Sequence, residues 1–403
     1  MPPSFLPSRS NGAAHSPEDR PRRMEVGLLG LSIPPRERVL KAVANAEALG
    51  YDAMWWPDHL MGMHPRAIWT EDVTPLARYV PNPDVFLDTV ACIAIAGLAT
   101  ERMRLGASVT EAVRRHPAML ANEWLTLDHL SRGRAILGIG AGEAENIRPY
   151  GLVHDRPVAR LAEALSVIKL LWSSNEAVDF DGEFWRLDHA VLGLTPYREG
   201  RPPPIWIGGQ GPRMLDLVGR IGDGWMPAHL LADEYAHKAA AVRASAIAAG
   251  RDPASITYGL GTSMVLAETR EKAQQLLANR AVKAPLLFLQ AAAFERHGHR
   301  HPLGDQGSGL LNYIPSRLSR AKVLAAVDAI SPDVAEAYIW HGTPDDIVAH
   351  ALDFVPGGLQ HLQLGNLTHL ADLKLGMASE ALLDDVRTQL QAIATRTPEP
   401  AQP

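Results

Sequence analysis

The stretch Arg132-Gly-Arg-Ala-Ile-Leu-Gly-Ile-Gly-Ala-Gly-Glu143 contains the pattern that decides the fold. A basic turn leads into a short apolar strand, predicted over 135–139, which ends in alternating glycines followed by a carboxylate. Glycine has no Cβ, so a ligand or another backbone can approach the chain closely at Gly140 and Gly142. Glu143 can then hydrogen-bond to, or protonate, whatever lies against that bare backbone. The alternative is a plain strand-to-loop turn with a solvated Glu143.

Short apolar runs and amphipathic helices alternate on both sides of this stretch. Eight strands are predicted, at 26–31, 51–56, 104–109, 135–139, 204–207, 224–226, 256–265 and 361–364. The predicted helices span 35–50, 83–100, 117–130, 158–172, 212–221, 233–249, a stretch from 269, and 344–354. This alternation predicts an α/β fold, a (β/α)8 TIM barrel with insertions. A doubly wound nucleotide-binding fold needs a glycine fingerprint after its first strand, and Leu31-Ser-Ile-Pro-Pro35 contains no glycine.

We expect a single barrel domain over residues 24–394, with insertions at about 59–83 and 283–339. Excursions of this length are typically lids or binding loops. The second contains His297, His299 and His301, whose spacing in a polar loop is more typical of solvated surface than of a metal site. Residues 1–23 are interpreted as a disordered extension, or as an over-long gene model that truly starts at Met24. Residues 395–403 are expected to be a disordered tail.

Composition and charge exclude several classes of partner. The net charge of −6 argues against a nucleic-acid or anionic-membrane partner. The single cysteine, Cys92, excludes a disulfide framework and fits a reducing cytoplasm. No segment approaches the roughly 18 unbroken apolar residues that a membrane span needs.

Catalytic residues in a (β/α)8 barrel lie at the C-terminal ends of the strands. The second strand ends in Trp55-Trp-Pro-Asp-His59, where histidine is the residue type suited to proton transfer near neutrality. Asp58 could orient this loop, and a structural cap is the alternative for His59. The third strand ends in Leu105-Gly-Ala-Ser-Val-Thr-Glu111, and Glu111 is either a second candidate acid or a loop carboxylate.

The fifth strand end, Trp206-Ile-Gly-Gly-Gln-Gly-Pro-Arg213, opens a predicted helix. Clustered glycines before a helix N-terminus expose backbone N–H groups, so Gly208, Gly209, Gln210 and Gly211 could hold a phosphate. A plain strand-to-helix turn is the alternative. No metal is expected, because the first strand offers neither His-x-His nor paired carboxylates.

Together these strand ends resemble the bacterial luciferase-like superfamily, and within it the deazaflavin (coenzyme F420)-dependent branch. The resemblance runs from Met24 to the final strand and includes similarity to the mycobacterial phthiodiolone and phenolphthiodiolone dimycocerosate ketoreductases. The motifs that carry it are Trp56-Pro-Asp-His59, Leu105-Gly-Ala-Ser-Val-Thr110, His116-Pro-Ala118, Leu127-Asp-His-Leu-Ser-Arg-Gly-Arg134, Gly138-Ile-Gly-Ala-Gly-Glu143, Ile207-Gly-Gly-Gln-Gly211 and Arg296-His-Gly-His-Arg-His-Pro-Leu-Gly304.

The resemblance implies roles for individual residues. It implies a non-prolyl cis peptide between Ser108 and Val109 that backs the deazaflavin ring. It makes His59 the active-site histidine and Glu143 the carboxylate beside the ring. It places the cofactor phosphate on residues 208–211, and Asp58, Gly140 and Gly142 also count among the expected cofactor-binding residues.

The implied function is F420-dependent transfer of a hydride between the deazaflavin and a carbonyl or alcohol. His59 is expected to carry the proton, with Glu111 as the alternative carrier. Met63 stands where related sugar-phosphate dehydrogenases carry tryptophan, which favours a small-molecule or lipid-like carbonyl substrate over a sugar phosphate. The alternatives are an FMN-dependent monooxygenase, a non-catalytic ligand-binding barrel and, less favoured, a metal-dependent hydrolase. A cytoplasmic homodimer is expected.

Overall fold

Eight parallel strands close into a barrel in the part of the chain that the computed structural model describes, residues 22–304 and 309–395. Their order around the ring is β4-β3-β2-β14-β11-β10-β9-β6, and β6 pairs with β4 to close it. The predicted (β/α)8 TIM barrel is therefore confirmed. The barrel strands are β2 (Glu25–Leu29), β3 (Ala53–Trp56), β4 (Arg104–Ala107), β6 (Ala135–Gly140), β9 (Ile205–Ile207), β10 (Gly224–Trp225), β11 (Thr257–Gly261) and β14 (His361–Leu364).

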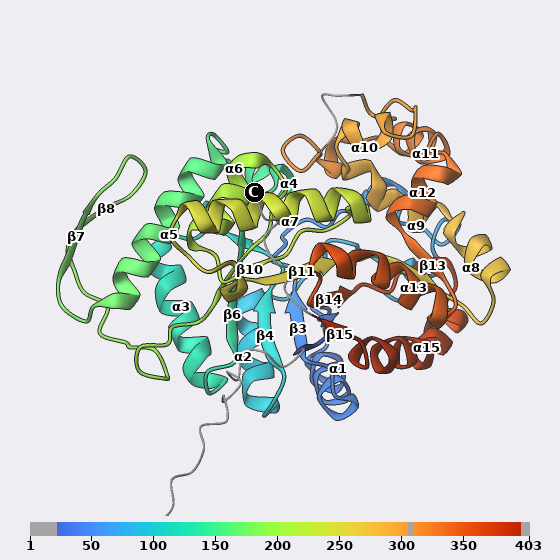
Figure 1. The fold of residues 1–403 in the computed structure, drawn as a ribbon. Helices are drawn as coiled ribbons and strands as arrows, with labels where there is room; N and C mark the ends of the chain where they lie inside the picture. The colour runs from blue at the N-terminus through green and yellow to red at the C-terminus, as the bar shows by residue number, and fades with distance from the viewer. Residues whose placement is uncertain (1–21, 305–308, 396–403) are drawn as a thin grey trace, which may run out of the picture.

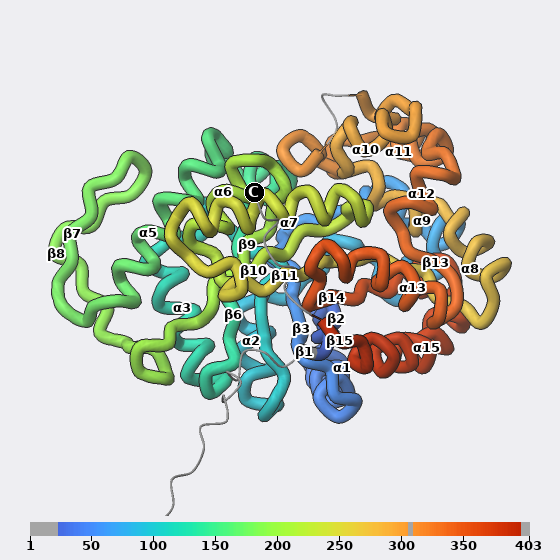
Figure 2. Tube along the Cα trace, viewed as in Figure 1, coloured from blue at the N-terminus to red at the C-terminus, as the bar shows by residue number. Residues whose placement is uncertain are grey.

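Helices surround this ring (Figures 1 and 2). The larger ones are α1 (Arg36–Leu49), α2 (Thr89–Ala99), α3 (Pro117–Leu130), α5 (Pro157–Ser173), α6 (Pro212–Ile221), α7 (Ala232–Ala248), α13 (Pro344–Phe354) and α15 (Leu373–Gln391). The helix predicted from position 83 begins only at Thr89, because the Asp88 side chain accepts a hydrogen bond from Ala91 N and caps the helix there. Helix α15, which the sequence analysis did not predict, follows the short α14 (Thr368–Ala371) and contacts β2 and α13.

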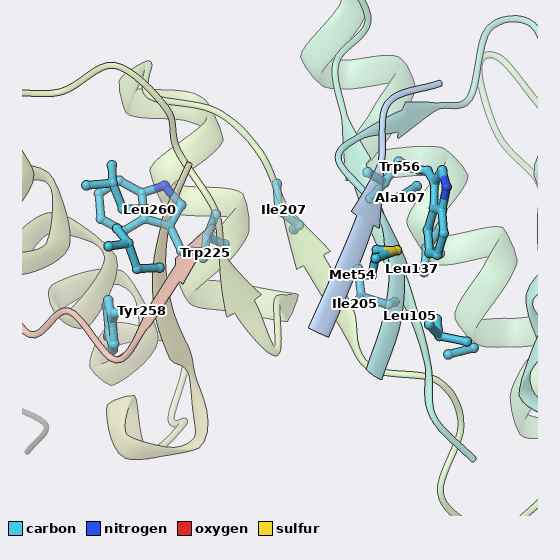
Figure 3. Close-up of a cluster of buried hydrophobic side chains, with 14 of the residues drawn as sticks. Met54, Trp56, Leu105, Ala107, Leu137, Ile205, Ile207, Trp225, Tyr258 and Leu260 are labelled. Atoms are coloured by element: carbon cyan, nitrogen blue, oxygen red, sulfur yellow. The ribbon is translucent and has the colours of Figure 1, made fainter. Parts of the chain in front are cut away.

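The barrel strands present their two faces to two different cores. Ala53 and Trp55 of β3 face the barrel interior with Trp206, and the two indole rings lie 5.0 Å apart between centroids. Met54 and Trp56 belong to the large cluster between strands and helices, shown in Figure 3. Successive side chains of a strand point to opposite faces, so the tryptophan pair is divided between the two cores. Both tryptophans therefore pack the barrel.

The two predicted insertions contact each other and form a second core beside the barrel, at the upper right of Figure 1. Ile68 of the first insertion and Phe294 of the second are both buried in it. Tyr313 Oη also donates a hydrogen bond to Met63 O, with a donor–acceptor distance of 3.1 Å. The elements here include the short helices η2 (Arg66–Ile68), η3 (Pro75–Arg78), η6 (Ala284–Phe288) and η8 (Pro315–Arg317), and the helices α8 (Arg270–Leu277), α9 (Arg280–Lys283), α10 (Ala291–Glu295), α11 (Arg320–Asp328) and α12 (Pro332–Tyr338).

The strand predicted over 256–265 is two strands in the structure. Its first half is β11 in the ring, and its second half is β12 (Met264–Leu266), which pairs in parallel with β13 (Trp340–Gly342) outside the ring. The break falls at the small polar run Gly261-Thr-Ser263, which the predicted strand included.

The three histidines of the second insertion differ in their exposure to solvent. His299 is exposed, with Nε2 3.2 Å from an Asp333 carboxylate oxygen, which agrees with the expectation of solvated surface. His301 is buried, with Nε2 3.1 Å from Leu287 O and its ring edge-on to Phe294. The expectation is therefore wrong for His301, because Phe294 at the start of the same run and the backbone of Leu287 lie against its ring.

A β-hairpin that the sequence analysis did not predict extends to one side of the molecule, at the left of Figure 1. It consists of β7 (Val178–Asp181) and β8 (Arg186–Ala190), paired antiparallel. The Glu163 carboxylate on α5 accepts hydrogen bonds from the backbone N–H groups of Glu183, Phe184 and Trp185 at 2.7–2.9 Å. One helix side chain therefore holds the hairpin turn.

The two ends of the described chain pair with each other. Strand β1 (Arg22–Arg23) runs antiparallel to β15 (Ala394–Thr395), and Arg23 forms an ion pair with Asp52. The predicted extension and tail are therefore each shorter at their inner boundaries, because composition does not register pairing between the two ends of a chain. The rest of both segments, 1–21 and 396–403, lies outside the described residues. Among the described helices, none is long and apolar enough to cross a membrane.

Candidate active site

Glycines at the ends of β6 and β9 surround the side chain of Val109. The Ser108–Val109 peptide bond is cis, as the resemblance implies. A Cβ at Gly140 would lie 2.8 Å from Val109 Cγ2, and one at Gly208 would lie 3.1 Å from Val109 Cγ1. Ser108 Oγ donates a hydrogen bond of 2.9 Å to Gln363 Oε1 at the end of β14. Four residues predicted from separate motifs thus meet at one place, where bare backbone flanks a small apolar side chain and can accept a flat ring.

Gly142 makes the turn that follows β6. Its φ is 88°, in the left-handed region that favours glycine, and a Cβ there would lie 2.6 Å from Ile147 Cδ1. The turn leads directly to Glu143, which precedes the short helix α4 (Ala144–Ile147). The predicted glycines therefore aim Glu143 back towards the strand ends.

Residues 208–211 form the loop before α6, and Gly211 is the N-cap of that helix. The loop is held by a hydrogen bond of 2.9 Å from Trp225 Nε1 to Gly209 O and by one of 2.5 Å from Gln210 Nε2 to Ala228 O. Gly209 has a φ of 154°, and a Cβ there would press on Met214 at 2.8 Å. Gly211 is exposed, and a Cβ there would meet no heavy atom within 4 Å. The loop is thus rigid where it leaves the barrel and open at the helix N-terminus.

His59 and Glu143 lie together, joined by a residue that the sequence analysis missed. Asn146 Nδ2 lies 2.7 Å from His59 Nδ1 and donates a longer hydrogen bond, 3.5 Å, to Glu143 Oε2. Asn146 Oδ1 accepts hydrogen bonds from the backbone N–H groups of Leu60 and Met61 at 2.7 and 3.0 Å. Because the oxygen faces two donors, the amide nitrogen must face the histidine. His59 Nδ1 is therefore an acceptor, and the proton of the neutral ring sits on Nε2.

Glu145 is the second residue here that the sequence analysis missed. It is 1% exposed, and its carboxyl group lies near that of Glu143. One nitrogen of His59 and one oxygen from each carboxyl group all lie within 4.8 Å of one another. Burial, and then the charge of Glu143 and the hydrogen bond to it, raise the pKa of Glu145 far above its ordinary value.

Asp58 and Glu111 are held by arginines directly behind the site. Asp58 accepts hydrogen bonds of 2.6 Å from Thr110 Oγ1 and 2.5 Å from Arg115 Nη1, and Arg114 Nη2 is 3.2 Å away. Glu111, at the end of β5 (Thr110–Glu111), accepts a hydrogen bond of 2.5 Å from Arg114 Nε and others from the backbone. Both carboxylates are buried, and their oxygens already accept hydrogen bonds from the groups named above. Both carboxylates support the loops, and Glu111 also faces Gly142, where a built Cβ would lie 3.5 Å from Glu111 Cγ.

A cavity of about 190 Å³ lies between the two insertions, close to the loop that carries His59. Desolvation lowers the pKa of His64 in its wall to about 4, so this ring is neutral at physiological pH. A larger cavity of about 610 Å³ lies between α8 and α13, and no predicted site residue lines it. The smaller cavity is lined by Met61, His64, Arg66, Ala67, Asp84, Pro315, Ser316 and Leu318.

The sequence contains only weak signals for the site residues that were not predicted from it. Glu145 and Asn146 follow Glu143 within three positions, so the run Glu143-Ala-Glu-Asn146 after a strand end was visible as a polar cluster. The arginine pair Arg114-Arg115 follows Glu111 just as closely. Nothing in the sequence shows that Asn146 reaches a histidine 87 positions earlier.

Comparison with known proteins gives consistent results. A sequence model of the luciferase-like monooxygenase family matches residues 4–361. The phthiodiolone/phenolphthiodiolone dimycocerosates ketoreductase of Mycobacterium tuberculosis (strain H37Rv) is 36% identical over 338 residues, covering 83% of this chain and 88% of the relative.

Two solved structures share the fold. An F420-dependent secondary alcohol dehydrogenase in complex with an F420–acetone adduct has a TM-score of 0.69 at 21% identity, covering 90% of this chain and 99% of that one. The coenzyme F420-dependent tetrahydromethanopterin reductase of Methanopyrus kandleri has a TM-score of 0.68 at 20% identity, covering 88% and 97%.

Proposed function

Because the chain belongs to the luciferase-like monooxygenase family, we propose that it is an F420-dependent oxidoreductase of the ketoreductase type. It transfers a hydride between the deazaflavin and a carbonyl or alcohol substrate. The observation that carries the proposal is the contact of Asn146 with both His59 and Glu143, close in sequence after Gly140, the strand end that packs on Val109. The relative named a ketoreductase, 36% identical over most of both chains, supports the same reaction class.

The chain's own residues fit the deazaflavin in two places. Val109, whose side chain fits closely over Gly140 and Gly208, would hold the ring. Residues 208–211 would hold the phosphate, because the N-terminus of α6 presents backbone N–H groups and the positive end of its dipole there. When bound, this cofactor supplies a carbon that gives or takes a hydride.

His59 carries the proton. Hydride addition to a carbonyl carbon leaves charge on the oxygen, which an acid must neutralise. Asn146 holds Nδ1 as an acceptor, so Nε2 is the nitrogen that presents its proton to the substrate oxygen. The side chain is 11% exposed, which leaves the ring accessible and limits competing water.

Glu143 serves the polar edge of the cofactor, and its side chain is 26% exposed beside Gly142. Asp58 and Glu111 are positioning residues. Their carboxylates bind Arg114 and Arg115 and so hold the two loops in place. Glu111 remains the control position for the assignment of the proton carrier.

The substrate is a small-molecule or lipid-like carbonyl compound that reaches the site between the insertions. The cavity there combines apolar walls, from Met61, Pro315 and Leu318, with polar groups at its rim. The relative is named for dimycocerosates, and this supports a lipid-like substrate for this chain.

Cofactor binding tests this assignment most directly at Gly211. Asp is a favourable N-cap residue and meets no steric obstacle there, so Gly211→Asp should fold normally while placing a negative charge at the phosphate position. We expect at least about a tenfold loss of F420 affinity, equivalent to about 1.4 kcal/mol, measured by fluorescence titration. Gly211→Asn, of equal shape and no charge, is the control. Equal affinities in the two variants would remove the phosphate assignment. Gly209→Asp is less informative, because its Cβ would press on Met214.

An FMN-dependent monooxygenase is the second candidate, favoured by the description of the matching family. Such an enzyme binds FMN tightly and consumes oxygen when supplied with reduced flavin. A panel of ketones and alcohols assayed with oxidised and reduced F420 separates the two functions. F420 binding without any turnover would instead indicate a ligand-binding barrel.

We also propose a homodimer formed through the outer surface of α2 and α3. Four large apolar side chains are exposed there: Ile95, Leu98, Met119 and Leu130, with Leu98 72% exposed. The backbone of Leu130 lies 3.4 Å from a Cβ built on Gly97, so the two helices end side by side. Exposed large apolar side chains on two neighbouring helices suit an interaction site, and a twofold dimer is the commonest way to cover them. The buried free thiol of Cys92 supports a reducing compartment, and we expect the cytoplasm.

A further inference from the structure

A second histidine, His229, lies at the mouth of the barrel, across from His59. In the order around the ring, β10 is the fourth strand from β3 in either direction, so these two strands lie on opposite sides of the barrel. His59 follows the end of β3 by a few residues, and His229 follows the end of β10 by a few residues. Because the carboxyl ends of parallel barrel strands share one face, both histidines lie at the same end of the barrel.

The residue before His229 is tied to the site through two neighbouring strand ends. Ala228 forms a parallel β-bridge with Gly261 at the end of β11. A Cβ built on Gly261 would lie 3.4 Å from Ala228 Cβ and 3.5 Å from Gln363 Oε1. Gln363 Oε1 is the atom that accepts the hydrogen bond from Ser108 Oγ. The backbone that leads into His229 is therefore packed beside the residues of the proposed cofactor site.

The side chain of His229 is held by two neighbours, and one of its ring nitrogens is free. Nε2 lies 3.2 Å from Ser263 Oγ, and the ring packs edge-on against Phe288 of the second insertion, with 5.3 Å between ring centroids. The side chain is half-buried, and Nδ1 has no hydrogen-bond partner among the residues that the structure describes. The φ of His229 is 55°, a left-handed conformation that is uncommon outside glycine and is held here by the surrounding contacts.

The free nitrogen of this ring suits a neutral polar group better than a charged one. Burial lowers the pKa of His229 to about 4, so the ring carries no charge near neutral pH. The Ser263 hydroxyl group can donate to Nε2 or accept from it, so Nδ1 is a donor in the first case and an acceptor in the second. A hydroxyl group both donates and accepts, and it therefore pairs with either form of the ring. A carboxylate or a phosphate would find no opposite charge on His229.

We propose that His229 is a specificity-determining residue whose free ring nitrogen binds a hydroxyl group of the carbonyl substrate. This rests on the oxidoreductase function proposed above. His59 contacts the reacting oxygen on one side of the barrel mouth, and His229 contacts the hydroxyl group on the other side. The substrate class is therefore a hydroxyketone, or the corresponding diol in the reverse direction, in which the hydroxyl group stands away from the reacting carbon. Contact at two separated points fixes the orientation of the carbonyl group before hydride transfer.

Binding measured without turnover tests this contact. Oxidised F420 has no hydride to give, so calorimetry of the protein with oxidised F420 can compare hydroxyketones with ketones of equal chain length. Over a series of chain lengths, we expect the native chain to bind the best hydroxyketone about tenfold more tightly than its matched ketone, the upper range for one neutral hydrogen bond. His229→Gly should remove this preference, because glycine accepts the left-handed backbone and lacks the ring.

A histidine elsewhere in the chain gives the matched control. His189 also has a positive φ, 48°, and lies in the hairpin at the left of Figure 1. His189→Gly should therefore leave the preference for hydroxyketones unchanged. His229→Asn is the second variant, since asparagine also adopts the left-handed conformation and its side chain is too short to replace the ring. It should lose most of the preference, and thermal unfolding checks that all three variants are folded.

The possible results separate recognition by His229 from the proposed function. Equal binding of the matched compounds by the native chain, or no binding of either, overturns the recognition, and so does a preference that survives in both His229 variants. A lower F420 affinity in these variants would assign His229 to the cofactor instead, because Ala228 O accepts a hydrogen bond from Gln210 of the phosphate loop. If the native chain reduces no ketone or does not bind F420, the proposed function fails, and the same titrations made without cofactor still decide whether His229 selects hydroxyketones.

Discussion

Asn146 decides which nitrogen of His59 can give a proton to a substrate. Its amide oxygen is taken up by the backbone N–H groups of Leu60 and Met61, so its NH₂ group must point at Nδ1. The same two hydrogen bonds fix the loop that carries His59 to the short helix that follows Glu143. One amide therefore sets the tautomer of the histidine and its distance from the carboxylate.

Substitution of His59 should affect turnover and not cofactor binding. We expect His59→Ala to retain F420 affinity and lose about 10²–10⁴-fold in kcat, the usual contribution of general acid–base catalysis. Glu111→Gln is the comparison, because the neutral amide weakens the ion pair with Arg114 without removing the shape. Steady-state kinetics and F420 titration measure both. Normal turnover in His59→Ala with loss in Glu111→Gln would make Glu111 the proton carrier.

Glu145 should make the stability of the fold depend on pH. Burial, and then Glu143, raise its pKa above the value of about 4.3 for an exposed glutamate. Between those two values the folded state binds a proton that the unfolded state lacks. The free energy of unfolding therefore falls as pH rises, by at most about 1.4 kcal/mol per pH unit from this group. Glu145→Gln should become more stable relative to the native chain between about pH 5 and pH 8, as urea unfolding at each pH can show. A difference that stays constant over this range contradicts an acid at position 145.

At the scale of elements, the site depends on how closely β4 and β6 approach. A Cβ built on Gly138 would lie 1.7 Å from Ala107 O, so only glycine fits where the barrel closes. The chain continues from β4 to Val109, and β6 ends at Gly140. A change in the spacing of these two strands would therefore move the residues proposed to contact the cofactor. The glycines of this motif therefore have different roles: Gly138 allows the barrel to close, and Gly140 belongs to the proposed cofactor site.

Gly138→Ala should accordingly destabilise the whole barrel. We expect a loss of about 3 kcal/mol or more in the free energy of unfolding, the upper range for overpacking, because the clash is with backbone that cannot rotate away. Gly193→Ala is the control, since a Cβ there meets nothing within 4 Å. Thermal and denaturant unfolding of both variants measure the difference. A Gly138→Ala protein as stable as the Gly193→Ala protein would mean that the strands can separate at little cost.

At the scale of the whole molecule, side-chain packing is divided among separate hydrophobic cores. The largest core lies between the barrel strands and their helices, and another joins the two insertions. The cavity near the His59 loop is lined by both insertions, so in the proposed function the insertions would provide the substrate surface. We expect substitutions in the cavity, such as Leu318→Ala, to change substrate preference before they change cofactor affinity.

The α2–α3 surface tests the oligomeric state. The native chain should have twice the mass of a 43.7 kDa chain by light scattering. A charge at the most exposed position, Leu98→Glu, should give monomers, because a twofold interface places the new charges near each other. Met377→Glu, equally exposed on α15, should leave the mass unchanged. A native mass of one chain at micromolar concentration would reject the dimer.

The sequence by itself determined the barrel and the strand ends that carry its glycines and carboxylates. Apolar runs, glycine turns and helix caps are local, and all eight strands of the ring could be placed from them. In a parallel barrel the C-terminal strand ends share one face, so residues from separate motifs were expected to meet there, as Ser108, Val109, Gly140 and Gly208 do.

Only the tertiary structure decided which of these polar groups act on one another. Side-chain direction decides three of these contacts. They are the contact of Asn146 with His59, that of Glu145 with Glu143, and the ion pairs of Asp58 and Glu111 with arginines. The pairing of β1 with β15 and the joining of two insertions into one core depend on contacts between distant parts of the chain. Such contacts leave no periodic pattern in the sequence, because they are set by the packing of many neighbours at once. The charge state of a carboxyl group follows from the same packing, since burial and neighbouring charges determine its pKa.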